Sequence, residues 1–145
     1  MPAHGVTVDD TFKAMDRLFK ADIDPARVAA IVIEPVQGEG GFHIAPTELL
    51  QRLRTLCDEH GIVLIADEVQ SGFGRTGKMF AIEHSGVKPD LMTMAKSMAA
   101  GMPISAVVGT AEHMDASGGN SLGGTYSGSP VSCAATLAVM EVFEE

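Results

Sequence analysis

The chain has 145 residues, of which 46% are hydrophobic and 20% are charged, and its formal net charge at pH 7 is -9. This length allows one hydrophobic core of ordinary domain size. The acidic excess and the scattered basic residues exclude a basic stripe of the kind that binds nucleic acid. No apolar run approaches the roughly twenty residues of a membrane helix, so a membrane-spanning protein is not expected either.

The start of the chain and its cysteines favour the cytoplasm. The opening residues, Met-Pro-Ala-His-Gly, have neither the basic start nor the apolar core of a secretory signal. Cys57 and Cys133 are far apart in the sequence and fall in expected helices, where small buried thiols are common. We therefore expect a soluble cytoplasmic protein with reduced cysteines.

Hydrophobic spacing predicts helices that alternate with short apolar strands. Helices are expected over residues 8–19, over residues 46–60 and from Pro130 onwards, because apolar residues recur there at helical spacing and proline stands at a first turn. Gly61 marks the end of the second helix. The expected strands cover residues 29–34, 62–67, 91–95 and 105–109.

This order of elements predicts an α/β fold with a mostly parallel sheet flanked by helices. The first strand is apolar throughout, which suits a strand covered on both faces. A strand, a helix and a second strand in succession form a right-handed crossover, which brings the carboxyl ends of parallel strands to one edge of the sheet. Functional groups are expected at that edge.

Two ionisable residues, Asp67 and Lys96, follow such strands. Residues 62–70 read Ile-Val-Leu-Ile-Ala-Asp-Glu-Val-Gln, and residues 91–96 read Leu-Met-Thr-Met-Ala-Lys. A lysine drawn out of water favours its neutral amine, which is a nucleophile able to form a Schiff base. A nearby acid would hold a cationic ring nitrogen. This pair is the arrangement expected around pyridoxal phosphate.

Blocks of sequence around this pair carry a family resemblance. Residues 33–41 read Ile-Glu-Pro-Val-Gln-Gly-Glu-Gly-Gly, and residues 64–77 extend the aspartate strand through Ser-Gly-Phe-Gly-Arg-Thr-Gly. Residues 95–97 are Ala-Lys-Ser, and residues 123–126 are Gly-Gly-Thr-Tyr. From about Val6 to its last residue, the chain resembles the class III aminotransferases, which use pyridoxal phosphate. Within that family it is most similar to the 4-aminobutyrate aminotransferases.

The resemblance implies a fold-type I pyridoxal-phosphate transferase in which residues 1–145 form part of the large, cofactor-binding domain. The small substrate domain and the N-terminal phosphate loop have no counterpart in this sequence. The implied reaction moves an amino group from an ω-amino acid such as 4-aminobutyrate to a 2-oxo acid such as 2-oxoglutarate. The resemblance also implies a homodimer with shared active sites.

The resemblance assigns the cofactor contacts residue by residue. Lys96 would carry the cofactor and would then act as general base and acid. Asp67 would pair with the pyridinium nitrogen, and Val69 would pack on one face of the ring. Gln70 would hydrogen-bond the phenolic oxygen. Thr125 would reach the phosphate of the neighbouring subunit.

Two acidic residues near these positions receive different roles. The glutamate of the family that matches Glu39 faces the substrate pocket and pairs with an arginine, so Glu39 is expected to contact substrate. Glu68 is expected to be structural. In addition, the glycines of residues 38–41 predict a loop with positive backbone angles.

Other interpretations stay open. Residues 72–78 fit the Gly-x-x-x-x-Gly-Lys part of a nucleotide-binding loop, but Met79 stands where that loop needs a hydroxyl. The histidines show no i, i+4 pair, so no metal site is expected.

Other reactions on the same framework also stay open. An aminomutase, a racemase or a decarboxylase would share Asp67 and Lys96. A truncated chain without catalytic activity is the non-enzymatic alternative.

Overall fold

The computed structural model describes residues 5–119 and 123–144. Residues 1–4, on which the expectation of no secretory signal partly rests, lie outside these ranges. The α-helices are α1 (Val8–Ala21), α2 (Thr47–His60), α3 (Ala111–Asp115) and α4 (Pro130–Glu144). The 3-10 helices are η2 (Pro25–Arg27), η3 (Ala81–Ser85) and η4 (Lys96–Ala99). Within the described ranges, no helix is both long and apolar enough to cross a membrane.

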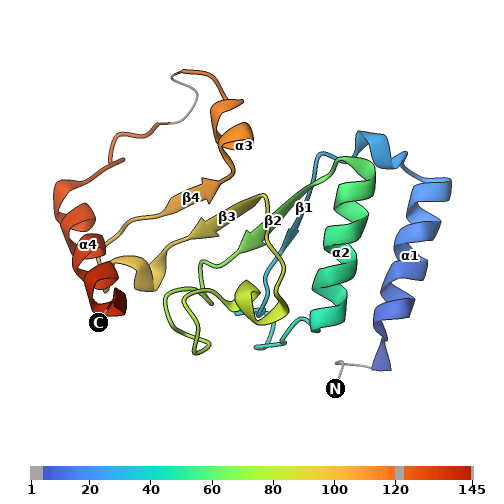
Figure 1. Ribbon diagram of the computed structural model, residues 1–145, viewed down its shortest axis with the longest axis horizontal. Helices are drawn as coiled ribbons and strands as arrows, with labels where there is room; N and C mark the ends of the chain where they lie inside the picture. Colours follow the sequence, from blue (N-terminus) through green and yellow to red (C-terminus); the bar gives the residue numbers. More distant parts are fainter. Residues whose placement is uncertain (1–4, 120–122, 145) are drawn as a thin grey trace.

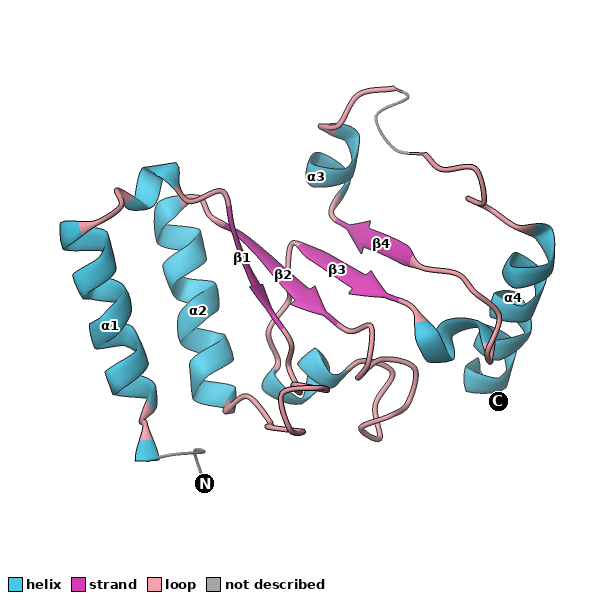
Figure 2. Ribbon diagram, turned by 180° about the vertical axis from the view of Figure 1, so that it is seen from behind, coloured by secondary structure: helices cyan, strands magenta, loops and turns pink. Residues whose placement is uncertain are grey.

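One sheet organises the chain, in the order β1 (Ala30–Ile33), β2 (Val63–Asp67), β3 (Leu91–Met94) and β4 (Ala106–Gly109). The first three strands run parallel, and β4 pairs antiparallel with β3. Helices α1 and α2 lie side by side at the β1 end of the sheet, and α4 lies at the β4 end (Figure 1). Figure 2 shows the same arrangement from behind. The predicted α/β fold with a mostly parallel sheet is therefore confirmed.

Local signals explain where the first two helices begin and end. The Thr7 hydroxyl accepts a hydrogen bond from the Asp10 amide, and the Asp10 side chain accepts one from the Thr7 amide, which forms a capping box on α1. Helix α2 ends at Gly61, whose φ of 67° is strained for residues with a Cβ atom. The Arg52 guanidinium joins both helices, because it contacts Asp9 at 2.7 Å and lies 4.1 Å from the centroid of the Phe12 ring.

The core lies between α2 and β2. Leu53 and Cys57 of α2 pack with Ile62 and Leu64, and apolar side chains of α1 cover the same cluster. Alternation along β2 places Leu64 in this interior. A separate cluster of Phe73, Met94 and Met98 lies beneath the segment that carries Lys96.

The structure corrects two expectations about the strands. Ile31 and Ile33 pack on the core, but Val32 is 63% exposed, so the expectation that both faces of β1 are covered is wrong for this chain. Alternate side chains of a strand point to opposite faces, and α1 and α2 cover only one of them. Strand β3 ends at Met94, so Lys96 belongs to a short helix that follows the strand. The 3-10 helices and α3 are too short to produce a hydrophobic period.

An ion pair ties α2 to the centre of the sheet. Asp90, which precedes β3, accepts hydrogen bonds from Arg54 Nη1 at 2.8 Å and from the Leu64 amide at 2.7 Å. Burial alone would raise the pKa of the Asp90 carboxyl, but the Leu64 amide and Arg54 outweigh that effect and lower the pKa below its ordinary value of 3.8.

The lowered pKa predicts how stability depends on pH. A carboxyl group whose pKa is lower in the folded state stabilises the fold above its unfolded pKa, and this contribution is lost as the pH falls through the folded value. Asp90→Asn keeps an oxygen for the Leu64 amide but removes the charge. We therefore expect the variant to lose about 1–2 kcal/mol in free energy of unfolding at pH 7. The difference should shrink below about pH 4.

Urea denaturation at pH 7, 5 and 3 measures this difference. Asp58→Asn is the matched control, because Asp58 also pairs with Arg54, at 2.8 Å, but its side chain is 66% exposed. Such an exposed ion pair contributes about 0–1 kcal/mol to the free energy of unfolding. An equal loss for Asp90→Asn at pH 7 and at pH 3 would show that the charge of Asp90 is unimportant.

Candidate functional site

Asp67 is held by one of its two carboxylate oxygens. It is the last residue of β2 and lies in register with Thr93 of β3. Its Oδ1 atom accepts hydrogen bonds from the Val69 amide at 3.0 Å and from the Thr93 hydroxyl at 3.1 Å. Over residues 5–119 and 123–144, no hydrogen bond reaches Oδ2 of Asp67. The carboxylate is therefore oriented, with one oxygen left for an external cation.

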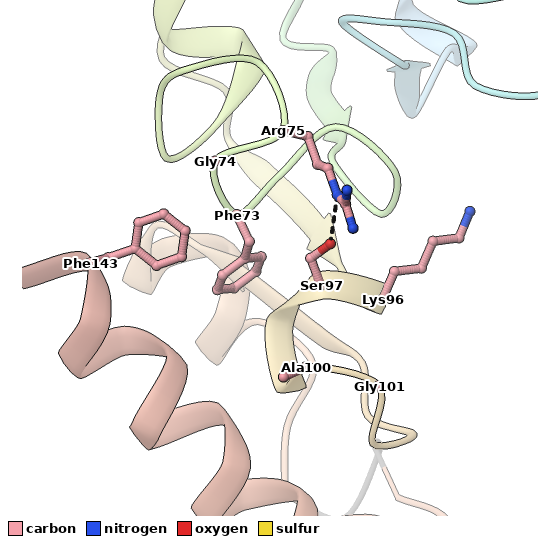
Figure 3. Close-up of a pocket in the computed structure, with 8 residues that line it drawn as sticks. All are labelled: Phe73, Gly74, Arg75, Lys96, Ser97, Ala100, Gly101 and Phe143. Carbon is pink, nitrogen blue, oxygen red and sulfur yellow. Dashed lines mark hydrogen bonds between the residues drawn. The ribbon is translucent and has the colours of Figure 1, made fainter.

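Lys96 follows the neighbouring strand in an unusual backbone conformation. Its φ is 45°, in the left-handed region that residues with a Cβ atom seldom adopt and that recurs at functional sites. The helix η4 that begins at Lys96 is anchored by buried Met98 and Ala99. Arg75 Nε also donates to the Ser97 hydroxyl at 2.9 Å, beside Lys96 (Figure 3). The segment that follows Lys96 is thus held by packing and by a hydrogen bond.

The side chain of Lys96 meets Gln70, because its Nζ atom donates to Gln70 Oε1. Two residues assigned from the resemblance are thereby brought into direct contact. The expectation that Lys96 is drawn out of water is not met within the described part of the chain, where the residue is exposed. The physical reason is that loops form the walls around it, and the hollows between these loops open to solvent.

Lys96 stands between two hollows that share Arg75, Lys96 and Ser97. The hollow of about 470 Å³ is lined by Val36, Gly38, Glu39, Phe42, Gln70, Ser71, Arg75, Thr76, Lys96 and Ser97. The hollow of about 790 Å³, drawn in Figure 3, is lined by Phe73, Gly74, Arg75, Lys96, Ser97, Ala100, Gly101 and Phe143. In that view Lys96 points away from the two phenylalanine rings. The smaller hollow is the candidate site, because it combines Lys96, Gln70 and Glu39.

The wall opposite Gln70 is a tight loop that joins β1 to α2. An antiparallel bridge between Val36 and Ile44 closes the loop. The Gly38 amide donates to Glu34 Oε2 at 2.9 Å, and the Gly38 carbonyl accepts from the Gly41 amide at 3.1 Å. Gly41 has a φ of 114°, as expected for a glycine of this loop, whereas Gly38 and Gly40 have no positive φ. Glu39 lies exposed on the wall of the smaller hollow.

Glu68 is fully buried, with 0% of its surface exposed. Its carboxylate accepts hydrogen bonds from the Ser71 hydroxyl at 2.5 Å, the Ala81 amide at 3.1 Å and the Ile82 amide at 2.7 Å. These bonds join the end of β2 to η3 and close the loop that carries Gln70. The structural role expected for Glu68 is confirmed.

Thr125 is the predicted site residue that the structure keeps apart. It is exposed in the segment between α3 and α4, and no hydrogen bond among the described residues joins it to Lys96, Asp67 or Gln70. Asp67 lines neither of the two hollows. It lies at the end of β2, and its carboxylate accepts a hydrogen bond from the amide of Val69, the residue before Gln70.

Sequence reasoning missed Thr93, Arg75 and Gly38 as supports of the site. Thr93 lies three positions before Lys96 on the adjoining strand, so an assumed parallel register would have placed it near Asp67. No local pattern indicates the contact of Arg75 with Ser97, because the two residues are 22 positions apart. The same is true of Gly38, which approaches Gln70 from a different loop.

The nucleotide-loop alternative does not fit the geometry. Residues 72–78 are followed by the 3-10 helix η3, whereas a phosphate loop opens an α-helix. The amides of Gly72, Gly74 and Gly77 donate to carbonyl groups of the loop or its flanks. These amides are therefore not free to cradle a phosphate. In the part of the chain that the structure describes, no group of His, Cys, Asp or Glu side chains could hold a metal ion.

The residues present fit the ring of pyridoxal phosphate. Asp67 presents an oriented carboxylate oxygen that suits a protonated ring nitrogen. Lys96 presents a primary amine, and Gln70 presents a side-chain amide that already contacts this amine. In its chemistry, this set of an oriented carboxylate, a primary amine and a side-chain amide suits a cationic ring that carries an aldehyde.

Comparisons with known proteins agree with this chemistry. The family model described as "Aminotransferase class-III" matches residues 3–145. A 5-aminovalerate aminotransferase of Pseudomonas putida is 62% identical over 142 residues, which cover 98% of this chain and 33% of the relative. A 4-aminobutyrate aminotransferase of Escherichia coli is 58% identical over 144 residues, which cover 99% of this chain and 34% of the relative. The chain thus spans about a third of the length of these relatives.

A solved structure shows the same arrangement of elements. It is an amine transaminase from an uncultivated Pseudomonas species, crystallised in its pyridoxal-phosphate-bound form. The two proteins superpose with a TM-score of 0.86 at 39% identity. The match covers 94% of this chain and 32% of that one.

Proposed function

This chain belongs to the class-III aminotransferases, and from that premise we propose that the whole protein is a pyridoxal-phosphate-dependent transaminase of ω-amino acids. One observation carries the proposal. Lys96 and Asp67 follow the carboxyl ends of adjacent parallel strands, and Gln70 contacts the amine of Lys96. The relatives that act on 5-aminovalerate and 4-aminobutyrate support an ω-amino donor. The proposed acceptor is a 2-oxo acid such as 2-oxoglutarate.

Each residue of the group has a defined task in this proposal. When bound, pyridoxal phosphate supplies a protonated ring that withdraws electrons from the substrate carbon. Oδ2 of Asp67 would hold the proton on the ring nitrogen. The amine of Lys96 would take a proton from the substrate carbon as general base and would deliver it to a carbon of the cofactor as general acid. Gln70 would bond the phenolic oxygen, and Val69 would pack on the ring. Glu39 would face the substrate.

We propose that two copies of the protein assemble as a homodimer with shared active sites. Helix α4 supports this proposal, because its Leu137 and Val142 are 62% and 70% exposed. Thr125, which is also exposed, would bind the phosphate held by the partner subunit.

In the same proposal, residues 1–145 form part of the large domain, and other segments supply the small domain and the phosphate loop. A soluble, cytoplasmic location is proposed as well.

A chain without catalytic activity is the second candidate. Two observations favour it: Lys96 is exposed, and Val32 leaves one face of β1 open to solvent. A site that does not exclude water weakens the electrostatic interactions that catalysis needs. The two candidates differ in whether the amine of Lys96 reacts selectively with the cofactor.

Trapping with borohydride tests the proposal directly. The purified chain is incubated with pyridoxal phosphate and reduced, and the modified lysine is located by peptide mass. We expect modification to concentrate at Lys96, and Lys96→Arg to abolish it. Lys78→Arg, at an exposed lysine outside the site, is the control and should leave it unchanged. Modification spread over Lys13, Lys20, Lys78 and Lys88, or no modification, would favour the non-catalytic candidate.

An assay of the whole protein separates the reaction types. Transfer from 5-aminovalerate or 4-aminobutyrate to 2-oxoglutarate would produce glutamate. Inversion of an amino acid without a 2-oxo acid would indicate a racemase. Migration of the amino group within one molecule would indicate an aminomutase.

A further inference from the structure

Gly38 is where the loop between β1 and α2 approaches the site most closely. The residue is buried, and its Cα atom faces the side chain of Gln70. A Cβ atom at Gly38 would lie 2.7 Å from Cδ of Gln70, 2.9 Å from Nε2 and 3.0 Å from Cγ. Carbon atoms that are not bonded to each other pack at about 3.5–4.0 Å. Any side chain at position 38 therefore competes with Gln70 for the same space.

The backbone of Gly38 is held more firmly than the side chain of Gln70. The Gly38 amide donates to Glu34 Oε2 at 2.9 Å, and its carbonyl accepts from Gly41 and Phe42 amides at 3.1 and 3.3 Å. The Gln70 side chain, by contrast, rotates about single bonds between staggered rotamers. An added methyl group would thus displace the Gln70 amide, and the loop would stay in place.

The displacement would separate Gln70 from Lys96. Gln70 Oε1 accepts the hydrogen bond from Lys96 Nζ, and the atoms nearest a Cβ at Gly38 belong to the same amide group. Gly38 does not have a positive φ, so alanine fits its backbone conformation. A substitution at this position should therefore act on the site and leave the fold intact.

We propose that Gly38 is a positioning residue, whose missing side chain provides the space that holds the Gln70 amide against Lys96. The loop between β1 and α2 thereby sets the neighbour of the Lys96 amine. Any effect of the contact between Gln70 and Lys96 on cofactor binding rests on the proposed function. The contact itself rests on the geometry alone.

Gly38→Ala tests the proposal, with Gly40→Ala as the matched control. Gly40 lies in the same loop and also lacks a positive φ, but a Cβ there would face the exposed side chain of Gln37, with Oε1 at 3.0 Å. The readout is the pair of side-chain amide NMR signals of Gln70, identified by their loss in Gln70→Ala. We expect Gly38→Ala to shift these signals and Gly40→Ala to leave them in place. Thermal unfolding midpoints should stay close to that of the unsubstituted chain in both variants.

Cofactor affinity provides a second readout. Gly38→Ala should weaken binding of pyridoxal phosphate about three- to tenfold, the net value of one hydrogen bond. In a Gln70→Ala background the same substitution should add nothing, because the competing side chain has been removed. An equal loss in both backgrounds would overturn the proposal, as would unshifted Gln70 signals in Gly38→Ala.

The two proposals fail in different ways. If the unsubstituted chain does not bind pyridoxal phosphate, the proposed function is overturned for this chain. The Gln70 amide signals decide the role of Gly38 without any cofactor.

Discussion

Replacing Asp67 by alanine is expected to lower transamination by the whole protein on the order of 10³-fold, since removal of one preorganised electrostatic partner has effects of that size. The ring nitrogen would lose the carboxylate that keeps it protonated, and the ring would withdraw electrons less effectively. The effect on folding should be much smaller. Among the described residues, only the Val69 amide and the Thr93 hydroxyl lose their acceptor, which corresponds to about 1–2 kcal/mol in free energy of unfolding.

Asp67→Asn is the control that separates charge from geometry. An asparagine oxygen can still accept from Val69 and Thr93, so the fold and the local turn should be retained. The amide carries no charge, and we expect kcat to fall nearly as far as in the alanine variant. Steady-state kinetics and urea denaturation of the three proteins give the comparison. Comparable turnover in wild type and in either variant would show that Asp67 is not the partner of the ring.

The second large effect is expected on stability. Glu68→Ala removes the acceptor of three buried donors, the Ser71 hydroxyl and the Ala81 and Ile82 amides. Each unsatisfied buried donor costs about 1–3 kcal/mol, and neighbouring losses do not add fully, so we expect a total of roughly 3–5 kcal/mol. The total stability of a domain is only about 5–15 kcal/mol. Much of the chain's stability should therefore be lost.

Glu83→Ala is the matched control for this prediction. Glu83 is also a glutamate that accepts a backbone hydrogen bond, from the Phe80 amide at 2.7 Å, but it is exposed. Its loss should cost about 1 kcal/mol, as for other side chains that cap a helix at the surface. Urea denaturation of the chain measures both variants. A loss for Glu68→Ala no larger than that for Glu83→Ala would contradict the anchoring role.

The two predictions address different properties of neighbouring residues. Asp67 and Glu68 are adjacent carboxylates at the end of one strand, yet alternation points them to opposite sides. Glu68 turns inward and is fully buried, whereas one oxygen of Asp67 remains without a hydrogen bond among the described residues. The position within the strand thus assigns one carboxylate to stability and the other to chemistry.

The sequence was sufficient for the long helices and the strands, and it singled out the residues that are proposed for the site. Proline at a first turn, glycine at the end of α2 and apolar spacing are local signals, and they placed the long helices and the strands to within about two residues. The motifs around Asp67, Gln70 and Lys96 were recognisable because residues close in sequence carry them. The structure brings two of these residues, Lys96 and Gln70, into contact.

Other features depend on residues that are distant in sequence. The Thr93 hydroxyl reaches Asp67 only because β2 and β3 pair in parallel in one particular register. The approach of Gly38 to Gln70 depends on how two separate loops pack. The exposure of Val32 and Lys96 likewise depends on which faces the helices and loops cover.

By itself, then, the sequence determined the fold class, the family resemblance, and the placement of Asp67 and Lys96 at or just after the ends of strands. The tertiary structure alone decided which oxygen of Asp67 is held, which residue shapes the position of Gln70, and how far Lys96 is open to water. The physical reason is the range of the forces. Backbone hydrogen bonding and side-chain periodicity act over a few residues, whereas register, close packing and burial arise only when distant segments meet.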